Sequence, residues 1–415
     1  MNILLLTSEF APAAGGIGTY AREMAAAAVR LGADVTVVAP DYADTEVARV
    51  DRAAPFRIRR FPGGLHSMRD TPKKIRLAQA MVAAGRHDVV HAVDWPFFLP
   101  LALARRRTAA RLLLTVHGTE INEMQTRAKR LAVRLTGTFG PRAEVVANSG
   151  FTRELFLTRF DVPAERVRAV PLGVSEFWFG PRADPGDVRQ RLAVDPDAIV
   201  MVTVARLTRR KGHLATLAAL RLLPESLRAR ITWLIIGPDG EADYVAELRG
   251  AADAAETDIR FLGRLADENI RDIYGCADFF CLTGVPDTSG RVEGFGLVYL
   301  EAGACDLPSV ASDIGGVAEA VVAGRSGLLV ASAPSAIADA IARLAANEHL
   351  RTMLGRGALT HTRRLSWDRC AAETYGLAPV DDLRLPPIDG TAVVLAPADL
   401  DGIEVAATGQ HNGDP

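Results

Sequence analysis

Apolar residues in the first half of the chain form short β-branched runs separated by segments with helical spacing. Runs at Asn2–Thr7 and Ala33–Ala39 flank a helical pattern from Ile17 to Leu31. A strand–helix–strand beginning of this kind is typical of a parallel sheet covered by helices. Further strands are predicted at Val89–Ala92, Arg111–Val116 and Val145–Ala147.

The same pattern begins again in the second half, with a helix expected at His213–Leu223. Strands are predicted at Ala198–Ala205, Ile231–Ile236, Ile259–Leu262, Phe279–Leu282, Ser309–Ala311 and Gly327–Val330. The intervening stretch is dense in Pro, Gly and Asp, which is typical of an interdomain linker. The sequence therefore predicts an α/β protein with two Rossmann-like domains, residues 1–178 and 187–362, joined by a linker at 179–186.

From Pro379 onward the chain is rich in Pro, Gly and Asp and has no sustained periodicity. Residues 379–415 are therefore predicted to be a disordered tail, with one short strand at Thr391–Leu395 as an alternative.

Composition narrows the class of protein. A formal net charge of −2 over 415 residues gives no electrostatic case for nucleic acid binding. The start of the chain lacks the features of a signal peptide, and no apolar run approaches the length that spans a bilayer. The four cysteines show no metal-site spacing, so we expect buried thiols in a cytoplasmic protein.

Arginine greatly outnumbers lysine, which occurs only at positions 73, 74, 129 and 211. Basic clusters at Arg105–Arg107, Arg111 and the helical stretch Arg127–Arg134 are therefore interpreted as solvated faces. Docking onto an anionic surface is the alternative interpretation.

Open α/β sheets bind ligands beyond the carboxyl ends of their strands. Gly15 and Gly16 follow the first predicted strand and open the first helix, so their backbone can approach a ligand. Gly16-x-Gly18-x-x-Ala21 also matches a dinucleotide fingerprint, with Asp41 as the ribose acid. Seven residues separate that strand from the glycines, however, whereas the fingerprint needs a tight turn. An incidental flexible connection is the third possibility.

Candidate side chains follow two other strands of the first half. His117 ends the strand that begins at Arg111. His91, Asp94 and Trp95 lie in or after the preceding strand and are candidates for the acceptor side of the same site. A packing role for Trp95 is equally consistent with the sequence.

In the second half, Arg206 and Lys211 flank a short loop between a strand and a helix. Their cations can converge where a diphosphate would meet the helix N-terminus. Arg264 and Leu265 follow another strand and are candidates for holding a nucleotide base.

Two glutamates, Glu293 and Glu301, lie eight residues apart around a Gly-Phe-Gly turn. The apolar stretch Leu297–Ala304 predicts a helix, so Glu293 precedes the helix and Glu301 lies about two turns inside it. Free N–H groups of the first turn form a site for an anion. A carboxylate beside an anion site suits a ligand that carries both phosphate and hydroxyl groups, which points to a nucleotide sugar.

Taken together, these segments resemble the retaining GT-B glycosyltransferases of family 4. The resemblance runs from Met1 to about Leu377 and rests on the order and spacing of its motifs. These are Gly15-Gly16, Thr115-Val-His117-Gly, Ala147-Asn148-Ser149, Val170-Pro-Leu-Gly173-Val, Arg206 with Lys211-Gly, Glu293-x7-Glu301, Ser312-Asp-Ile-Gly-Gly316 and Gly324-x-x-Gly327.

The resemblance implies two Rossmann-like domains that face each other across a deep cleft, with a closing helix at 363–378 that crosses back to the first domain. It implies that Arg206 and Lys211 neutralise the departing diphosphate and that His117 contacts the sugar. Glu293 would hold sugar hydroxyls and Glu301 the ribose. Donor contacts are further expected from Gly15, Gly16, Arg264, Leu265, Gly294, Phe295, Gly296 and Leu297.

The predicted function is metal-independent, retaining transfer of a hexose-type sugar from a UDP- or GDP-sugar to an acceptor hydroxyl of a lipid, saccharide or small metabolite. No cofactor is expected, and peripheral contact with the inner membrane face is compatible with the sequence. Two alternatives stay open: another GT-B enzyme, such as an epimerase or phosphorylase, and a non-catalytic protein that binds nucleotide sugars.

Overall fold

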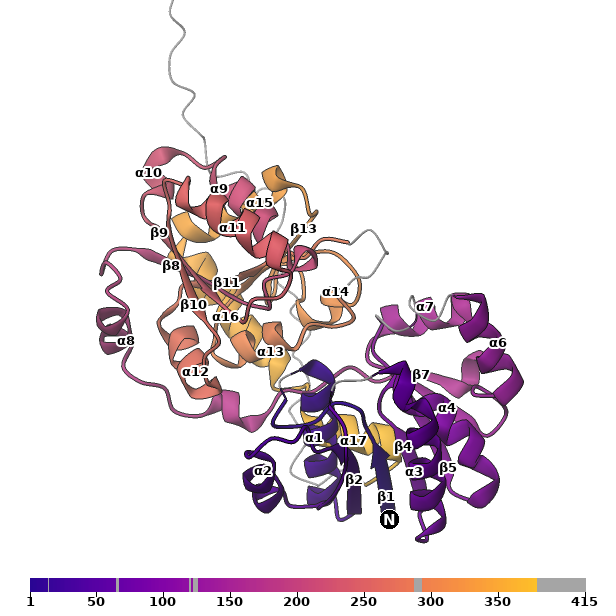
Figure 1. Ribbon diagram of the computed structural model, residues 1–415. Helices are drawn as coiled ribbons and strands as arrows, with labels where there is room; N and C mark the ends of the chain where they lie inside the picture. Colours follow the sequence, from indigo (N-terminus) through magenta and orange to yellow (C-terminus); the bar gives the residue numbers. More distant parts are fainter. Residues whose placement is uncertain (14, 65–66, 119–120, 122–125, 287–292, 379–415) are drawn as a thin grey trace, which may run out of the picture. The chain divides into compact units, whose positions relative to one another are not determined.

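Two parallel sheets organise the structure, a computed structural model that describes all residues except 14, 65–66, 119–120, 122–125, 287–292 and 379–415 (Figure 1). The predicted tail and the alternative strand Thr391–Leu395 lie outside the described residues.

The first sheet has seven parallel strands in the order β3-β2-β1-β4-β5-β6-β7. Their bounds are β1 Asn2–Leu6, β2 Asp34–Pro40, β3 Arg57–Phe61, β4 Val89–Ala92, β5 Arg111–Val116, β6 Ala143–Ala147 and β7 Val167–Ala169. Both faces of its central strands are buried: Ile3 and Leu5 belong to one apolar cluster, Leu4 and Leu6 to another. Continuous apolar runs are what such strands require.

Two strands of this sheet were not predicted. β3 has the sequence Arg-Ile-Arg-Arg-Phe and is at most half-buried, and β7 has three residues. Both are edge strands, so neither needs the apolar run that identifies a strand buried on both faces.

The second sheet has six parallel strands in the order β10-β9-β8-β11-β12-β13. Their bounds are β8 Ile199–Val204, β9 Ile231–Ile236, β10 Asp258–Gly263, β11 Phe279–Leu282, β12 Ser309–Ser312 and β13 Gly327–Val330. Every strand predicted for this half is present.

Helices connect the strands of both sheets (Figure 1). In the first half the α-helices are α1 Gly16–Arg30, α2 Val47–Ala53, α3 Thr71–Ala83, α4 Trp95–Ala104, α6 Arg127–Thr136 and α7 Gly150–Arg159. In the second half they are α8 Pro185–Arg191, α9 His213–Leu220, α10 Glu225–Arg228, α11 Ala242–Asp253, α12 Asp267–Cys276, α13 Leu297–Ala304, α14 Val317–Ala320, α15 Pro334–Ala346, α16 Glu348–Thr362 and α17 Trp367–Tyr375. Short 3-10 turns are η1 Met68–Asp70, η2 Arg105–Arg107, η3 Ala164–Arg166, η4 Glu176–Phe179 and η5 Arg209–Lys211.

The last described helix, α17, packs against α1 of the first domain (Figure 1). Arg168 donates to the carbonyl of Glu373 at 2.7 Å, and Arg111 donates to that of Tyr375 at 2.8 Å. The helix after residue 363 therefore belongs structurally to the first domain, although it follows the second in sequence.

Each sheet has a point where the strand order reverses, between β1 and β4 in the first and between β8 and β11 in the second. Loops that leave neighbouring strands in opposite directions diverge at such points and leave room for a ligand. The predicted site residues Lys211 and Glu293 follow β8 and β11, so they flank the reversal in the second sheet.

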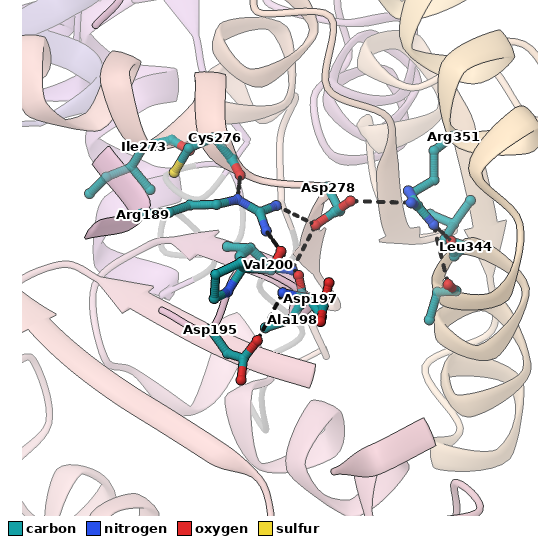
Figure 2. A network of polar contacts seen from close by, with 12 residues as sticks. Arg189, Asp195, Asp197, Ala198, Val200, Ile273, Cys276, Asp278, Leu344 and Arg351 are labelled. Carbon is teal, nitrogen blue, oxygen red and sulfur yellow. Dashed lines mark hydrogen bonds and ion pairs between the residues drawn. The ribbon is translucent and has the colours of Figure 1, made fainter. Parts of the chain in front are cut away.

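The opposite end of the second sheet is held by an ion network around Asp278 (Figure 2). One oxygen of Asp278 accepts from Arg189 at 2.9 Å and from the Val200 backbone at 2.8 Å. Its other oxygen lies 3.2 Å from Arg351. Asp278 thereby ties α8, β8 and α16 together at the amino ends of the strands.

All four cysteines are buried, as predicted from their spacing. Burial raises the pKa of the Cys276, Cys281, Cys305 and Cys370 thiols, which keeps them protonated at neutral pH.

Candidate active site

The centre of the site is an ion pair between Lys211 and Glu293, whose Nζ and Oε2 atoms lie 2.6 Å apart. Arg210 approaches the same oxygen at 3.8 Å. Burial of the Glu293 carboxyl would raise its pKa. The charges of Lys211, Arg210 and Arg206 outweigh burial and hold the pKa of this carboxyl below its ordinary value. Glu293 is therefore an anion at neutral pH, in contact with Lys211 and Arg210.

The loop that carries Lys211 is fixed against the end of β11 by Gly212. This residue has a φ of 74°, and a Cβ there would lie 1.8 Å from the Thr283 carbonyl oxygen. Only glycine fits, because both the backbone angle and the close approach exclude a side chain. Thr216 and Thr283 join the same elements through their hydroxyls at 2.6 Å.

The turn that carries Glu293 is equally constrained. Gly296 precedes α13 with a φ of 95°, and a Cβ there would meet the Tyr299 ring at 2.6 Å. A Cβ on Gly294 would lie 2.1 Å from the carbonyl oxygen of His117. Phe295 is buried, 1% exposed, so its side chain anchors the turn while its backbone stays at the start of α13.

Glu301 lies inside α13 in a contrasting electrostatic environment. Burial raises the pKa of its carboxyl to about 8, and the negative charges of Asp267 and Glu23 act in the same direction. Glu301 is therefore largely protonated at neutral pH and can donate a hydrogen bond as well as accept one.

His117 follows β5, and its Nε2 lies 2.9 Å from the carbonyl oxygen of Val93. Because a carbonyl only accepts, the proton of the neutral ring lies on Nε2. Burial lowers the pKa of His117 to about 4, against smaller opposing effects of Val93 and the Glu9 charge. The Tyr20 ring packs edge-on against it with centroids 5.0 Å apart. His117 is thus a neutral, oriented hydrogen-bonding group.

Comparisons with known proteins identify the family. Residues 14–176 match the family described as "Glycosyltransferase Family 4", and residues 186–361 match "Glycosyl transferases group 1". The chain belongs to the GT-B glycosyltransferases of family 4.

Relatives of this glycosyltransferase align along nearly their whole length. The D-inositol 3-phosphate glycosyltransferase of Actinosynnema mirum is 31% identical over 86% of this chain and 90% of its own. The GDP-mannose-dependent α-(1-6)-phosphatidylinositol monomannoside mannosyltransferase of Mycobacterium tuberculosis is 30% identical over 92% of this chain and 99% of its own.

Solved structures share the fold. HepE from Anabaena, solved with UDP and glucose, has a TM-score of 0.72 at 22% identity and aligns over 89% of this chain and 97% of its own. WaaG, a glycosyltransferase of lipopolysaccharide biosynthesis, has a TM-score of 0.68 at 15% identity, with 90% and 100% coverage. The GT-B fold class predicted from the sequence is confirmed.

One residue assigned to the acceptor side of the glycosyltransferase, His91, does not lie where a substrate could reach it. It is fully buried, and its two ring nitrogens lie 2.9 Å from the Tyr375 hydroxyl and 2.7 Å from that of Thr115. With both nitrogens occupied, His91 does not fit the predicted acceptor role. It links α17 to Thr115, whose hydroxyl lies 3.1 Å from that of Tyr20, the residue whose ring packs on His117.

Asp94 and Trp95 begin α4, beside the point where the first sheet reverses. One oxygen of Asp94 accepts from the backbone and hydroxyl of Ser8, whereas Oδ1 is buried without a partner among the described residues. Burial raises the pKa of Asp94 to about 7, and the Glu9 charge adds to this against the hydrogen bonds from Ser8 and the charge of Lys74. Trp95 packs edge-on against Phe98 at 5.7 Å, which matches the alternative packing role.

Two residues of the site were not identified from the sequence. Glu9 follows β1, and a Cβ on Gly15 would lie 2.9 Å from its carboxylate. Burial raises the pKa of Glu9, against the lowering effects of His117 and Arg206. The position of Glu9 at a strand end was the available signal. Arg210 is the second residue that the sequence did not identify, because nothing in the sequence distinguishes it from its neighbour Arg209.

The remaining donor-side candidates lie at the expected strand ends. No atom lies within 4 Å of a Cβ built on Gly16, so a ligand can approach that backbone. Arg206 is exposed just after β8. Arg264 and Leu265 follow β10, at the sheet edge and two strands away from β8; their assignment to the nucleotide base stays a prediction.

No helix among the described residues is long and apolar enough to cross a bilayer. Among the same residues there is no cluster of three or more His, Cys, Asp or Glu side chains suited to a metal ion.

Proposed function

We propose that this glycosyltransferase moves a hexose from a UDP- or GDP-sugar to an acceptor hydroxyl, with retention of anomeric configuration and without a metal ion. The observation that carries the proposal is the convergence of Lys211 and Arg210 on Glu293 at the reversal point of the second sheet, with the charge of Arg206 acting on the same carboxylate. A nucleotide sugar offers the matching chemistry, because its diphosphate is anionic and its hexose carries hydroxyl groups.

The reaction proposed for this site is leaving-group catalysis. The bond between the sugar's anomeric carbon and the diphosphate oxygen breaks, and its electron pair goes to that oxygen. Fixed cations such as Lys211 and Arg206 stabilise the negative charge as it develops there. The acceptor oxygen bonds to the anomeric carbon on the same face, and its proton passes to a donor phosphate oxygen.

Glu293 is assigned to the donor hydroxyls rather than to nucleophilic attack. Its contact with Lys211 lowers the basicity of the carboxylate and fixes its direction. Glu301 in its protonated form suits a ribose, since it can both donate to and accept from a hydroxyl pair. Neutral His117 supplies polar contact without adding a cation beside the developing positive charge of the sugar ring.

The acceptor is proposed to be a polyol of the inositol type, free or lipid-linked. This rests on two relatives, one named for D-inositol 3-phosphate and the other for phosphatidylinositol monomannoside. The same proposal places the transfer reaction at the cytoplasmic face of the membrane.

A thermal-shift panel of UDP-, GDP- and ADP-sugars tests the donor, because a ligand of the native state raises the melting temperature. Product analysis by NMR with inositol phosphates and phosphatidylinositol mannosides then tests transfer and the anomeric configuration. Transfer is expected to persist in EDTA. If none of the donors in the panel raises the melting temperature, the proposal is overturned.

The same experiments separate the alternatives. A nucleotide-sugar epimerase would convert the donor without any acceptor. A non-catalytic binding protein would show the thermal shift but neither transfer nor hydrolysis.

A further inference from the structure

Helix α6 of the first domain turns two leucines toward solvent. Leu131 is 56% exposed and Leu135 is 76% exposed, whereas Val133 is the buried residue of this helix. Residues four apart lie on the same side of a helix, so the two leucines form one apolar strip. The helix therefore packs on the domain through one side and presents apolar surface on another.

A strip of arginines runs beside the leucines. At about 100° per residue, Arg127, Arg130 and Arg134 fall on adjoining rows of the helix surface, and all three are exposed. In the described part of the chain none of the three pairs with a carboxylate. The sequence from Thr126 to Arg142 contains no acidic residue.

The basic surface continues beyond the end of α6. Arg105 donates to the carbonyl of Thr136, the last residue of the helix, at 2.6 Å. This contact places η2, with its exposed Arg106 and Arg107, next to the C-terminus of α6. The resulting α6 face consists of Arg127, Arg130, Leu131, Arg134 and Leu135, with Arg106 and Arg107 at its end.

We propose that the α6 face docks this enzyme on an anionic lipid bilayer. The leucines would enter the boundary between headgroups and acyl chains, and the arginines would remain among the lipid phosphates, as in helices that lie in a membrane interface. An acidic protein partner fits less well, because leucine is under-represented among the residues that dominate protein–protein binding, whereas here Leu131 and Leu135 form the apolar part of the face.

Charge and apolar area give the expected size of the effect. Each basic residue near an anionic surface contributes about fivefold in binding. Arg130→Gln with Arg134→Gln is therefore expected to weaken binding about 25-fold. Leu131→Gln with Leu135→Gln is expected to weaken it at least about tenfold through lost apolar burial.

The experiment is co-sedimentation of the full chain with vesicles of phosphatidylcholine alone or with about one-third phosphatidylglycerol. Binding is expected only to the anionic vesicles and is expected to weaken as salt is raised. Both double variants should bind more weakly by these factors and keep their melting temperature, because the four side chains are exposed. Leu222→Gln and Arg356→Gln are matched controls, since both are exposed residues of the second domain.

Equal binding of wild type and both double variants would overturn the proposal, as would the absence of binding to anionic vesicles. Concentration-dependent self-association that the leucine variant abolishes, without vesicle binding, would instead assign the face to a second copy of the chain. No donor or acceptor is present in the assay, so its result is independent of the proposed reaction.

Discussion

At each end of the second sheet a carboxylate lies between cations: Asp278 at the amino ends of the strands and Glu293 at the carboxyl ends. The exposed fraction of the two side chains does not distinguish them, but their contacts do. Asp278 and Glu293 are similarly exposed, 18% and 22%. Asp278 uses both oxygens, and its partners come from three separate elements. The contacts of Glu293 with Lys211 and Arg210 both fall on Oε2 and come from one loop.

The difference separates a structural network from a site. At Asp278 the donors come from separate elements and hold them together, so both carboxylate oxygens are used in contacts that stabilise the fold. At Glu293 a small loop gathers positive charge at the carboxyl ends of the strands, where a ligand would bind. Substitutions at the two ends should therefore affect different properties.

The largest effect is expected from Asp278→Asn on stability. Loss of the anion leaves Arg189 and Arg351 as partly buried cations, which should lower the free energy of unfolding by about 3 kcal/mol. Urea denaturation measures this, with the exposed Asp339→Asn as control. Turnover measured on the folded variant should stay within about twofold of wild type; a large loss of turnover would erase the distinction between the two ends.

Lys211→Ala is expected to lower turnover rather than stability. A charge-assisted contact contributes about 1.5–3 kcal/mol, so turnover should fall about 10- to 150-fold if the contact strengthens in the transition state. Steady-state kinetics measure this beside the exposed Lys73→Ala. Near-normal turnover would remove Lys211 from the mechanism.

Glu301→Gln should change the pH dependence of stability. The folded pKa of about 8 lies above the ordinary value of 4.5, so between those values the folded state holds a proton that the unfolded state lacks. Stability therefore falls with rising pH in this window, by up to about 1.4 kcal/mol per pH unit from this group. The variant should lose that slope, measured by urea unfolding from pH 5 to 8, whereas the exposed Glu348→Gln should retain it.

Arg210→Gln is expected to give the smallest change. Arg210 lies 3.8 Å from Glu293, beyond hydrogen-bond distance, whereas Lys211 lies at 2.6 Å; the contribution of Arg210 is therefore expected to be about 0.5–1 kcal/mol, below that of a charge-assisted hydrogen bond. Turnover should fall about two- to fivefold. A loss as large as that of Lys211→Ala would show that the two cations act as a unit.

Much of the fold follows from local patterns. The strands buried on both faces have continuous apolar runs, and these identified every strand except the edge strands β3 and β7. Glycines with positive φ at Gly212 and Gly296 carry their own signal, because those backbone angles exclude most other residues. The strand-end rule then assigned Lys211 and Glu293 to one nucleotide-sugar site; their direct contact at 2.6 Å was not predicted.

The sequence by itself determined the fold class and assigned the lysine loop and the glutamate turn to one ligand, since periodicity and residue type are local properties. Only the tertiary structure decided how each polar or apolar side chain is used. His91 and Asp94 lie in the same short stretch of sequence. His91 bonds to the hydroxyl of Tyr375, which is 284 residues away, whereas Asp94, among the residues described, has no hydrogen bond to Tyr375 and lies at the start of α4. Leu131 and Val133 look alike in the sequence, but packing buries one and exposes the other. Such outcomes depend on which distant segment covers a residue, and no local pattern contains that information.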